Sequence, residues 1–146
     1  MRISAKARYS LASMIYLADI GKTQETVTVL QISTELGISK IYLEQTFALL
    51  KRAGLVLSIK GPQGGYQLPR PASKITVLEI IAAVETSLFE ETESTVAEKA
   101  LAIDGTMADL VFTPLAKGVE QILKEISLEA LVQEAASRVS SYMFFI

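Results

Sequence analysis

The segment SIKGPQGGYQLPRP, from Ser58 to Pro71, most constrains how this chain can fold. Three glycines fall within five positions and two prolines close the segment, whereas apolar residues at helical spacing lie on both sides of it. Glycine permits sharp turns and proline resists helix, so the segment predicts a β-hairpin inside a helical protein. We expect the strands in LVLSIK and GYQLP, on either side of the turn GPQG.

Two short helices joined by a tight turn are predicted before this hairpin. VTVLQISTELG favours a short strand and then a helix that stops at Gly37, and the turn falls at Gly37–Ile38. ISKIYLEQTFALLKRAG predicts a second helix with Ser39 as N-cap and Gly54 as the stop. The apolar anchors expected on these helices are Leu30, Ile32, Leu36, Ile41, Phe47, Leu49 and Leu50.

A longer helix is expected at the start of the chain, from Ala5 to Ile20, with Gly21 as its end. Helix, helix, helix and hairpin is the element order of a winged helix-turn-helix. The predicted fold class is therefore mainly α with a small β-hairpin wing, and residues 1–75 form the DNA-binding domain. The expected apolar face of the first helix consists of Tyr9, Ala12, Ile15, Tyr16 and Ile20.

Charge is divided unevenly along the chain, although its net value is only −2. Residues 1–75 hold ten Lys or Arg and four acidic residues, whereas residues 76–146 hold four and twelve. This asymmetry predicts that the N-terminal half faces a polyanion, with chance clustering as the alternative. On the first interpretation Lys60 enters a minor groove, and the wing glycines let backbone N–H groups approach phosphates. An ordinary hairpin with a glycine-rich turn is the alternative for the wing.

The chain contains no cysteine and no histidine. Disulfides, thiolate ligation and a cysteine nucleophile are therefore excluded, and the commonest general base and metal ligand are missing. A site made only of carboxylates for Mg²⁺ or Ca²⁺ stays open, but we expect no metal, no cofactor and no enzymatic activity. No run approaches the ~18 apolar residues of a membrane span, and MRISAKARYSL does not read as a signal peptide. A cytoplasmic location is the resulting expectation.

Residues 76–136 are predicted to form linker and dimerisation helices. Thr76 and Glu79 have the spacing of a capping box, which opens a helix to about Glu85. Its expected buried stripe is Ile80, Ile81 and Val84, and the carboxylates Glu90, Glu91 and Glu93 are expected to be solvated.

A long apolar stripe follows at Leu115, Val119, Ile122 and Ile126. Little chain remains to cover it, so pairing with a second copy in a homodimer is expected, and packing back on the same subunit is the alternative. Pro114 either starts this helix or kinks it. A shorter helix capped by Ser127 is expected to end near Ala136. Residues 137–146 are then expected to be a flexible C-terminal tail.

The stretch YLEQTFALLKRAGLVLSIKGPQGGYQLPRPASKITVLEIIAAVE resembles the Rrf-type winged-helix regulators. This is the family of the iron–sulfur cluster regulator and the cysteine-metabolism repressor. The segments MRISAKARYSL and ISLEALV also match, and Tyr-Leu-Glu-Gln followed by Gly-x-x-Gly-Gly-Tyr is highly specific. The resemblance implies a homodimer that binds double-stranded DNA through its third helix and wing and controls transcription.

The resemblance also assigns roles to individual residues. Glu44 would accept a hydrogen bond from a cytosine amino group and Gln45 would pair with adenine, although Glu44 could also be a surface acid tolerated near DNA. Lys60 stands where the family usually has arginine, so the charge is kept and the planar fork is lost. The expected DNA-binding residues are Arg2, Ser4, Lys6 and Arg8 on the first helix, Ser39, Lys40, Tyr42, Glu44 and Gln45 on the recognition helix, and Lys60, Gly61, Gly64, Gly65 and Tyr66 on the wing.

Two departures from the family pattern lie in the C-terminal half. Cluster-binding relatives carry cysteines between the linker and dimer helices, where this chain has FEETESTVAEKALAIDGTMADL and no thiol. A cluster held in that manner is therefore excluded. Pro114 also interrupts what is normally a continuous dimer helix.

The final segment, SSYMFFI, resembles the endings of the family's cysteine-metabolism repressors, which associate with O-acetylserine sulfhydrylase. The resemblance implies that Tyr142, Met143, Phe144, Phe145 and Ile146 form a partner-binding tail, in which a carboxylate on Ile146 mimics that of the enzyme's substrate. A tail that packs on the dimer helices, or is disordered, is the alternative. The leading expectation is a cofactor-free repressor of cysteine or sulfur metabolism that is signalled through this enzyme. A cluster-free regulator that senses a small molecule or redox state, and an interaction module that does not read DNA, remain as alternatives.

Overall fold

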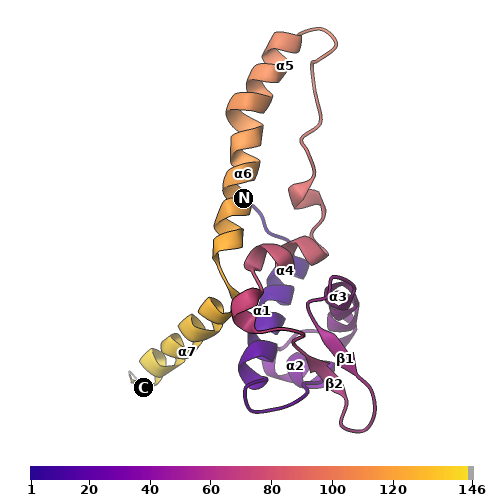
Figure 1. Ribbon diagram of the computed structural model, residues 1–146, viewed down its shortest axis with the longest axis vertical. Coiled ribbons are helices and arrows are strands. Elements are labelled where there is room, and N and C mark those ends of the chain that lie inside the picture. Colours follow the sequence, from indigo (N-terminus) through magenta and orange to yellow (C-terminus); the bar gives the residue numbers. More distant parts are fainter. Residues whose placement is uncertain (145–146) are drawn as a thin grey trace.

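Four helices and a two-stranded hairpin form the body of the protein, and a long helical rod rises from it (Figure 1). The computed structural model describes residues 1–144. No helix in this part of the chain is both long and apolar enough to cross a bilayer. The body contains α1 (Ala5–Ile20), α2 (Val29–Leu36), α3 (Lys40–Arg52), β1 (Leu57–Ile59), β2 (Gly65–Gln67), the 3₁₀ turn Ala72–Lys74 and α4 (Val77–Val84). The remainder contains the 3₁₀ turn Ser87–Phe89, α5 (Leu101–Met107), a π-helical turn (Ala108–Phe112), α6 (Thr113–Glu125) and α7 (Leu128–Phe144).

The hairpin confirms the predicted wing. Strands β1 and β2 pair antiparallel, with Ser58 opposite Tyr66. The short strand expected before α2 is reduced to a single bridge, in which Val27 and Tyr66 exchange backbone hydrogen bonds of 2.9 and 2.8 Å. Helix α2 begins directly afterwards because Thr28 caps it, accepting from the Gln31 amide at 3.1 Å.

The buried face of α1 coincides only in part with the predicted one, of which Ile15, Tyr16 and Ile20 are half-buried against the core. Tyr9 is exposed, whereas the residues that face the core are Ala7, Ser10, Ser13, Met14, Leu17 and Ala18. Small residues let α1 approach α4 and α7 closely. The Ser10 hydroxyl is satisfied by donating to the Lys6 carbonyl at 2.7 Å. Because Ser10 and Ser13 are buried on this face, the sequence pattern of apolar residues did not predict it.

Two of the expected apolar anchors are also wrong. Ile41 of α3 is 70% exposed and Leu30 of α2 is 59% exposed. The core-facing side of α3 is formed instead by Leu43, Phe47 and Leu50, all fully buried at a spacing of three and four residues. Ile41 lies outside this spacing and faces solvent.

Helix α4 opens with the predicted capping box. The Glu79 amide donates to the Thr76 hydroxyl at 3.2 Å, and the Thr76 amide donates to the Glu79 carboxylate at 2.8 Å. Partial burial acts to raise the pKa of Glu79, but hydrogen bonds from Thr76 and the charge of Arg70 outweigh it and lower the pKa. The predicted stripe of Ile80, Ile81 and Val84 is buried.

The rod comprises residues 101–125, and Pro114 does not break it. The chain is helical throughout, but the turn just before the proline is π-helical, with the Thr113 amide bonded to the Ala108 carbonyl. A proline in a helix clashes with the carbonyl four residues earlier, here that of Leu110. The wider turn relieves this clash, so the rod continues where an interruption was expected.

Helix α7 continues to Phe144, beyond the predicted end near Ala136. Ser127 caps it as expected, accepting from the Ala130 amide at 3.1 Å. The following sequence contains no glycine or proline, and Arg138 pairs with Glu134 at 2.9 Å one turn earlier. The segment expected to be a flexible tail from residue 137 is therefore helical as far as residue 144. Phe145 and Ile146 lie outside the described residues.

Two truncations on α3 test this assignment of faces. Phe47→Ala should lower the free energy of unfolding by ~3–5 kcal/mol, because it empties a fully buried site. Ile41→Ala should change it by no more than ~0.5 kcal/mol, because the side chain is exposed. Urea unfolding followed by circular dichroism measures both, and equal losses would contradict the observed face of α3.

Candidate nucleic-acid interface

The N-terminal end of α1 lies against the N-terminal end of α3. The rings of Tyr9 and Tyr42 meet edge to face, with centroids 5.4 Å apart. This contact brings together two predicted groups of DNA-binding residues, because Lys6 and Arg8 flank Tyr9 on the exposed side of α1. Arg2 is also exposed in the segment that leads into the helix.

Ser4 has a structural role at this end of the molecule. Its hydroxyl caps α1 by accepting from the Ala7 amide at 3.1 Å, and its own amide donates to Glu85 at 3.3 Å. Ser39 likewise caps α3, accepting from the Tyr42 amide at 3.5 Å. Both serines therefore orient the helix ends where phosphate contacts are expected.

The exposed face of α3 carries the predicted base-reading residues. Lys40, Glu44 and Gln45 are all exposed. Lys40 lies 3.7 Å from Glu44, and both side chains are more than half accessible. A pair this exposed contributes little to stability, so both groups are available for other partners.

The wing turn presents Lys60 and Gly61 to solvent. Gly64 and Gly65 also pack against the protein's own backbone, so each has a structural reason to be glycine in addition to the phosphate approach that is predicted for it. A Cβ on Gly64 would lie 2.4 Å from the Ile59 carbonyl oxygen, and one on Gly65 would lie 2.8 Å from that of Val27. Gly65 also has a φ of 151°, which disfavours any other residue.

Tyr66 holds the wing in place. Its backbone pairs with Val27, and its half-buried ring packs on Phe47 of α3 with centroids 4.8 Å apart. The Tyr66 side chain therefore links the wing to the recognition helix. The contact with DNA that is expected of Tyr66 stays a prediction.

Arg70 is a positioning residue that the sequence analysis missed. Its Nε donates to the Lys74 carbonyl at 3.0 Å, one Nη donates to the Gly54 carbonyl at 3.4 Å, and the other pairs with Glu79. It thus joins the end of α3, the exit of the wing and the start of α4. Only its place in the segment PRP distinguishes it in the sequence, and that place gives no sign of three partners.

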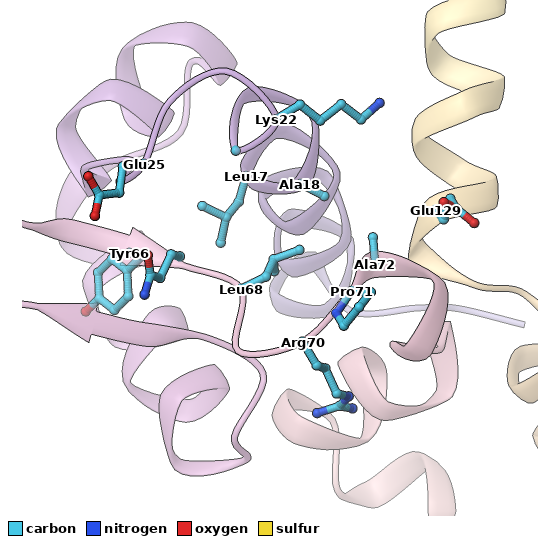
Figure 2. A pocket seen from close by; sticks show the side chains of 12 residues that line it. Leu17, Ala18, Lys22, Glu25, Tyr66, Leu68, Arg70, Pro71, Ala72 and Glu129 are labelled. Atoms are coloured by element: carbon cyan, nitrogen blue, oxygen red, sulfur yellow. The ribbon is translucent and has the colours of Figure 1, made fainter.

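A pocket of about 500 Å³ lies beside the wing exit, between the C-terminal end of α1 and the start of α7 (Figure 2). Leu17, Leu68 and Ala72 line its apolar part. Lys22 and Glu25 extend outward at its edge in Figure 2. The site can accept a small molecule that carries both polar and apolar groups, in contact with the wing exit and α7.

The rod exposes a series of large apolar side chains. Of the predicted dimerisation residues, Leu115 and Ile122 are exposed, and Val119 is half-buried. Ile126 lies beyond the end of α6 and packs against its own core, where its carbonyl accepts from the Val77 amide at 2.9 Å. The other exposed apolar residues of the rod are Leu101, Ile103, Leu110 and Val111.

The segment between α4 and α5 is organised by Asp104. Its carboxylate accepts from the Ser94 hydroxyl at 2.8 Å and from the amides of Thr95 and Val96 at 3.1 and 3.2 Å. These bonds, that from Ser94 first, lower the pKa of Asp104. Within residues 1–144 no three acidic side chains are grouped to hold a metal ion. The chain's donors therefore do not fit a thiolate-held cluster in this segment.

Comparison with known proteins identifies relatives along most of the chain. The family Rrf2, described as an iron-dependent transcriptional regulator, matches residues 3–134. The transcriptional regulator IscR of Xenorhabdus nematophila is 37% identical over 133 residues, which is 91% of this chain and 80% of that protein. IscR of Cereibacter sphaeroides is 45% identical over 89 residues, which is 60% of this chain and 57% of that protein. The structure of CymR, described as the global cysteine regulator of B. subtilis, is 31% identical with a TM-score of 0.72, over 92% of this chain and 98% of that one.

A glycine substitution tests how the wing is held. Gly65→Ala should lower the free energy of unfolding by at least ~1 kcal/mol, because φ is unfavourable and the new methyl group meets Val27. Gly37→Ala at the end of α2 is the matched control, because its φ is also positive, at 66°, but nothing lies within 4 Å of its Cβ position. It should lose only the cost of the left-handed backbone, ~1 kcal/mol, and therefore less than Gly65→Ala. Urea unfolding of the two variants decides, and a neutral Gly65→Ala would contradict the close approach.

Proposed function

Because this chain belongs to the Rrf2 family of transcriptional regulators, we propose that it is a homodimeric repressor whose α3 and wing read duplex DNA. The Tyr9–Tyr42 contact carries this proposal, because it places the basic start of α1 beside the exposed face of α3. Lys60 and Gly61 extend the same arrangement on the wing. The acidic residues are concentrated in the other half of the chain, which lowers repulsion from phosphates.

Dimerisation is proposed through the rod. Leu115 and Ile122 are 59% and 62% exposed on a helix that projects from the body (Figure 1). Large apolar side chains left accessible in this way favour an interface. A two-fold axis at the rod would present two copies of α3, as needed for a palindromic operator.

We further propose control of cysteine or sulfur metabolism through a protein partner. A structural neighbour is described as a global cysteine regulator, and the absence of thiols removes the usual ligands of a sensing cluster. The proposed contact with O-acetylserine sulfhydrylase uses residues 142–146. Tyr142 and Met143 support it because they are 62% and 71% exposed at the far end of α7.

A second candidate is direct sensing of a small molecule. The pocket between Leu17, Leu68 and Ala72 favours it, because the same cavity touches the wing exit and α7 (Figure 2). A molecule bound there would bias the wing's position only if it bound one position more tightly than the other.

DNA reading is tested with operator fragments selected from the genome of the source organism. Binding should weaken linearly in log–log form as salt rises, because each neutralised phosphate releases counterions. Gln45→Ala should reduce discrimination against a wrong base by ~1–3 kcal/mol. Gln133→Ala is the matched control, since Gln133 is exposed on α7 away from the interface. Fluorescence anisotropy measures both variants, and an interaction module that does not read DNA would give no salt-dependent specific complex.

The partner proposal is tested by removing Phe145 and Ile146. Co-purification with O-acetylserine sulfhydrylase of the same organism should be lost, while affinity for naked operator DNA stays within twofold. Tyr142→Ala should weaken the enzyme complex less, because that residue precedes the anchoring end. Unchanged co-purification of the shortened protein would reject the tail mechanism and favour direct sensing.

A further inference from the structure

We propose that Ile41 is a specificity-determining residue that contacts the methyl group of a thymine in the operator. This inference rests on the proposed DNA reading by α3. Ile41 is the second residue of that helix and is 70% exposed, whereas Leu43, Phe47 and Leu50 of the same helix are fully buried. It is the large apolar side chain that α3 leaves in solvent.

The position of Ile41 is suited to base contact. Residues in the first turn of a recognition helix reach base edges in the major groove. Ile41 shares the exposed side of α3 with Lys40, Glu44, Gln45 and Ala48. Gln45 follows it by four residues, so the two side chains are neighbours on the helix surface.

The chemistry of this pair selects the base. Glutamine pairs with the N6 and N7 atoms of adenine, and the partner of adenine is thymine. The C5 methyl group of thymine is the apolar feature of the major-groove edge. An isoleucine beside that glutamine therefore meets a thymine methyl in the same base pair or the adjacent one. Burying the two apolar groups together is favourable, and no polar group of either partner loses its hydrogen bond.

The exposed position also makes the contact separable from folding. Neither core packing nor a helix cap depends on Ile41, since Ser39 caps α3 and the core side of the helix lies elsewhere. Leu30 of α2 offers a matched control, because it is another large apolar residue and is 59% exposed.

Uracil substitution tests the inference directly, because uracil keeps the hydrogen-bonding groups of thymine and lacks only the methyl. Each thymine of the selected operator is replaced in turn, and Kd is measured by anisotropy at one salt concentration. One replacement should weaken wild-type binding about fourfold, the factor for one buried methyl group. That replacement should have no effect on the Ile41→Ala protein, whereas Ile41→Val and Leu30→Ala should keep the wild-type response.

The outcomes distinguish a failure of the Ile41–thymine contact from a failure of DNA reading by α3. If every uracil operator affects Ile41→Ala as it affects the wild type, the thymine contact is wrong and DNA reading by α3 stands. If neither protein forms a salt-dependent complex with any selected fragment, the proposed function fails and the contact fails with it.

Discussion

The paired backbone hydrogen bonds between Val27 and Tyr66 are the constraint on which the proposed interface depends. They fix the wing to the segment that leads into α2, and the Tyr66 ring then rests on Phe47 of α3. A hairpin with only three residues in each strand would be marginal by itself. The wing is therefore ordered by its attachment to the body, and the Tyr66–Phe47 contact and the Arg70 hydrogen bond to the Gly54 carbonyl place it beside the recognition helix.

A second attachment joins the rod to this body. The Val77 amide donates to the Ile126 carbonyl at 2.9 Å, and the Leu128 amide donates to the Ile75 carbonyl at 2.8 Å. Leu128 and Val132 then enter the core. The start of α4 is also where Arg70 meets Glu79. Residues 70–79 therefore connect the wing exit to the joint between α6 and α7, because they form bonds with both.

Local signals in the sequence predicted most of the body. Caps at Ser39 and Thr76 and the glycine-rich hairpin are each decided by neighbouring residues, so their positions could be read directly. The burial of small residues could not be predicted from the sequence, because a serine is found both on solvent-exposed faces and on faces that pack closely against another helix. This is why Ser10 and Ser13 concealed the core face of α1. Ile41 shows the opposite error, because a large apolar residue in a helix predicts burial, whereas this side chain is exposed.

The contacts of individual site residues were harder to predict from the sequence than the helices and strands. The DNA contacts of the basic and polar residues of α1 and α3 could be proposed from residue type and stay predictions. The structural roles of Gly64, Gly65 and Tyr66 became clear only from the backbone that they touch. Pro114 shows the same limit, because a widened turn and a broken helix are equally compatible with its sequence. The π-helical turn has one geometric result for the molecule. One extra residue in a helical turn rotates the part of the helix before it by roughly 100° about the helix axis. The side of the rod on which α5 (Leu101–Met107) presents its side chains is therefore set by Pro114, which lies later in the chain.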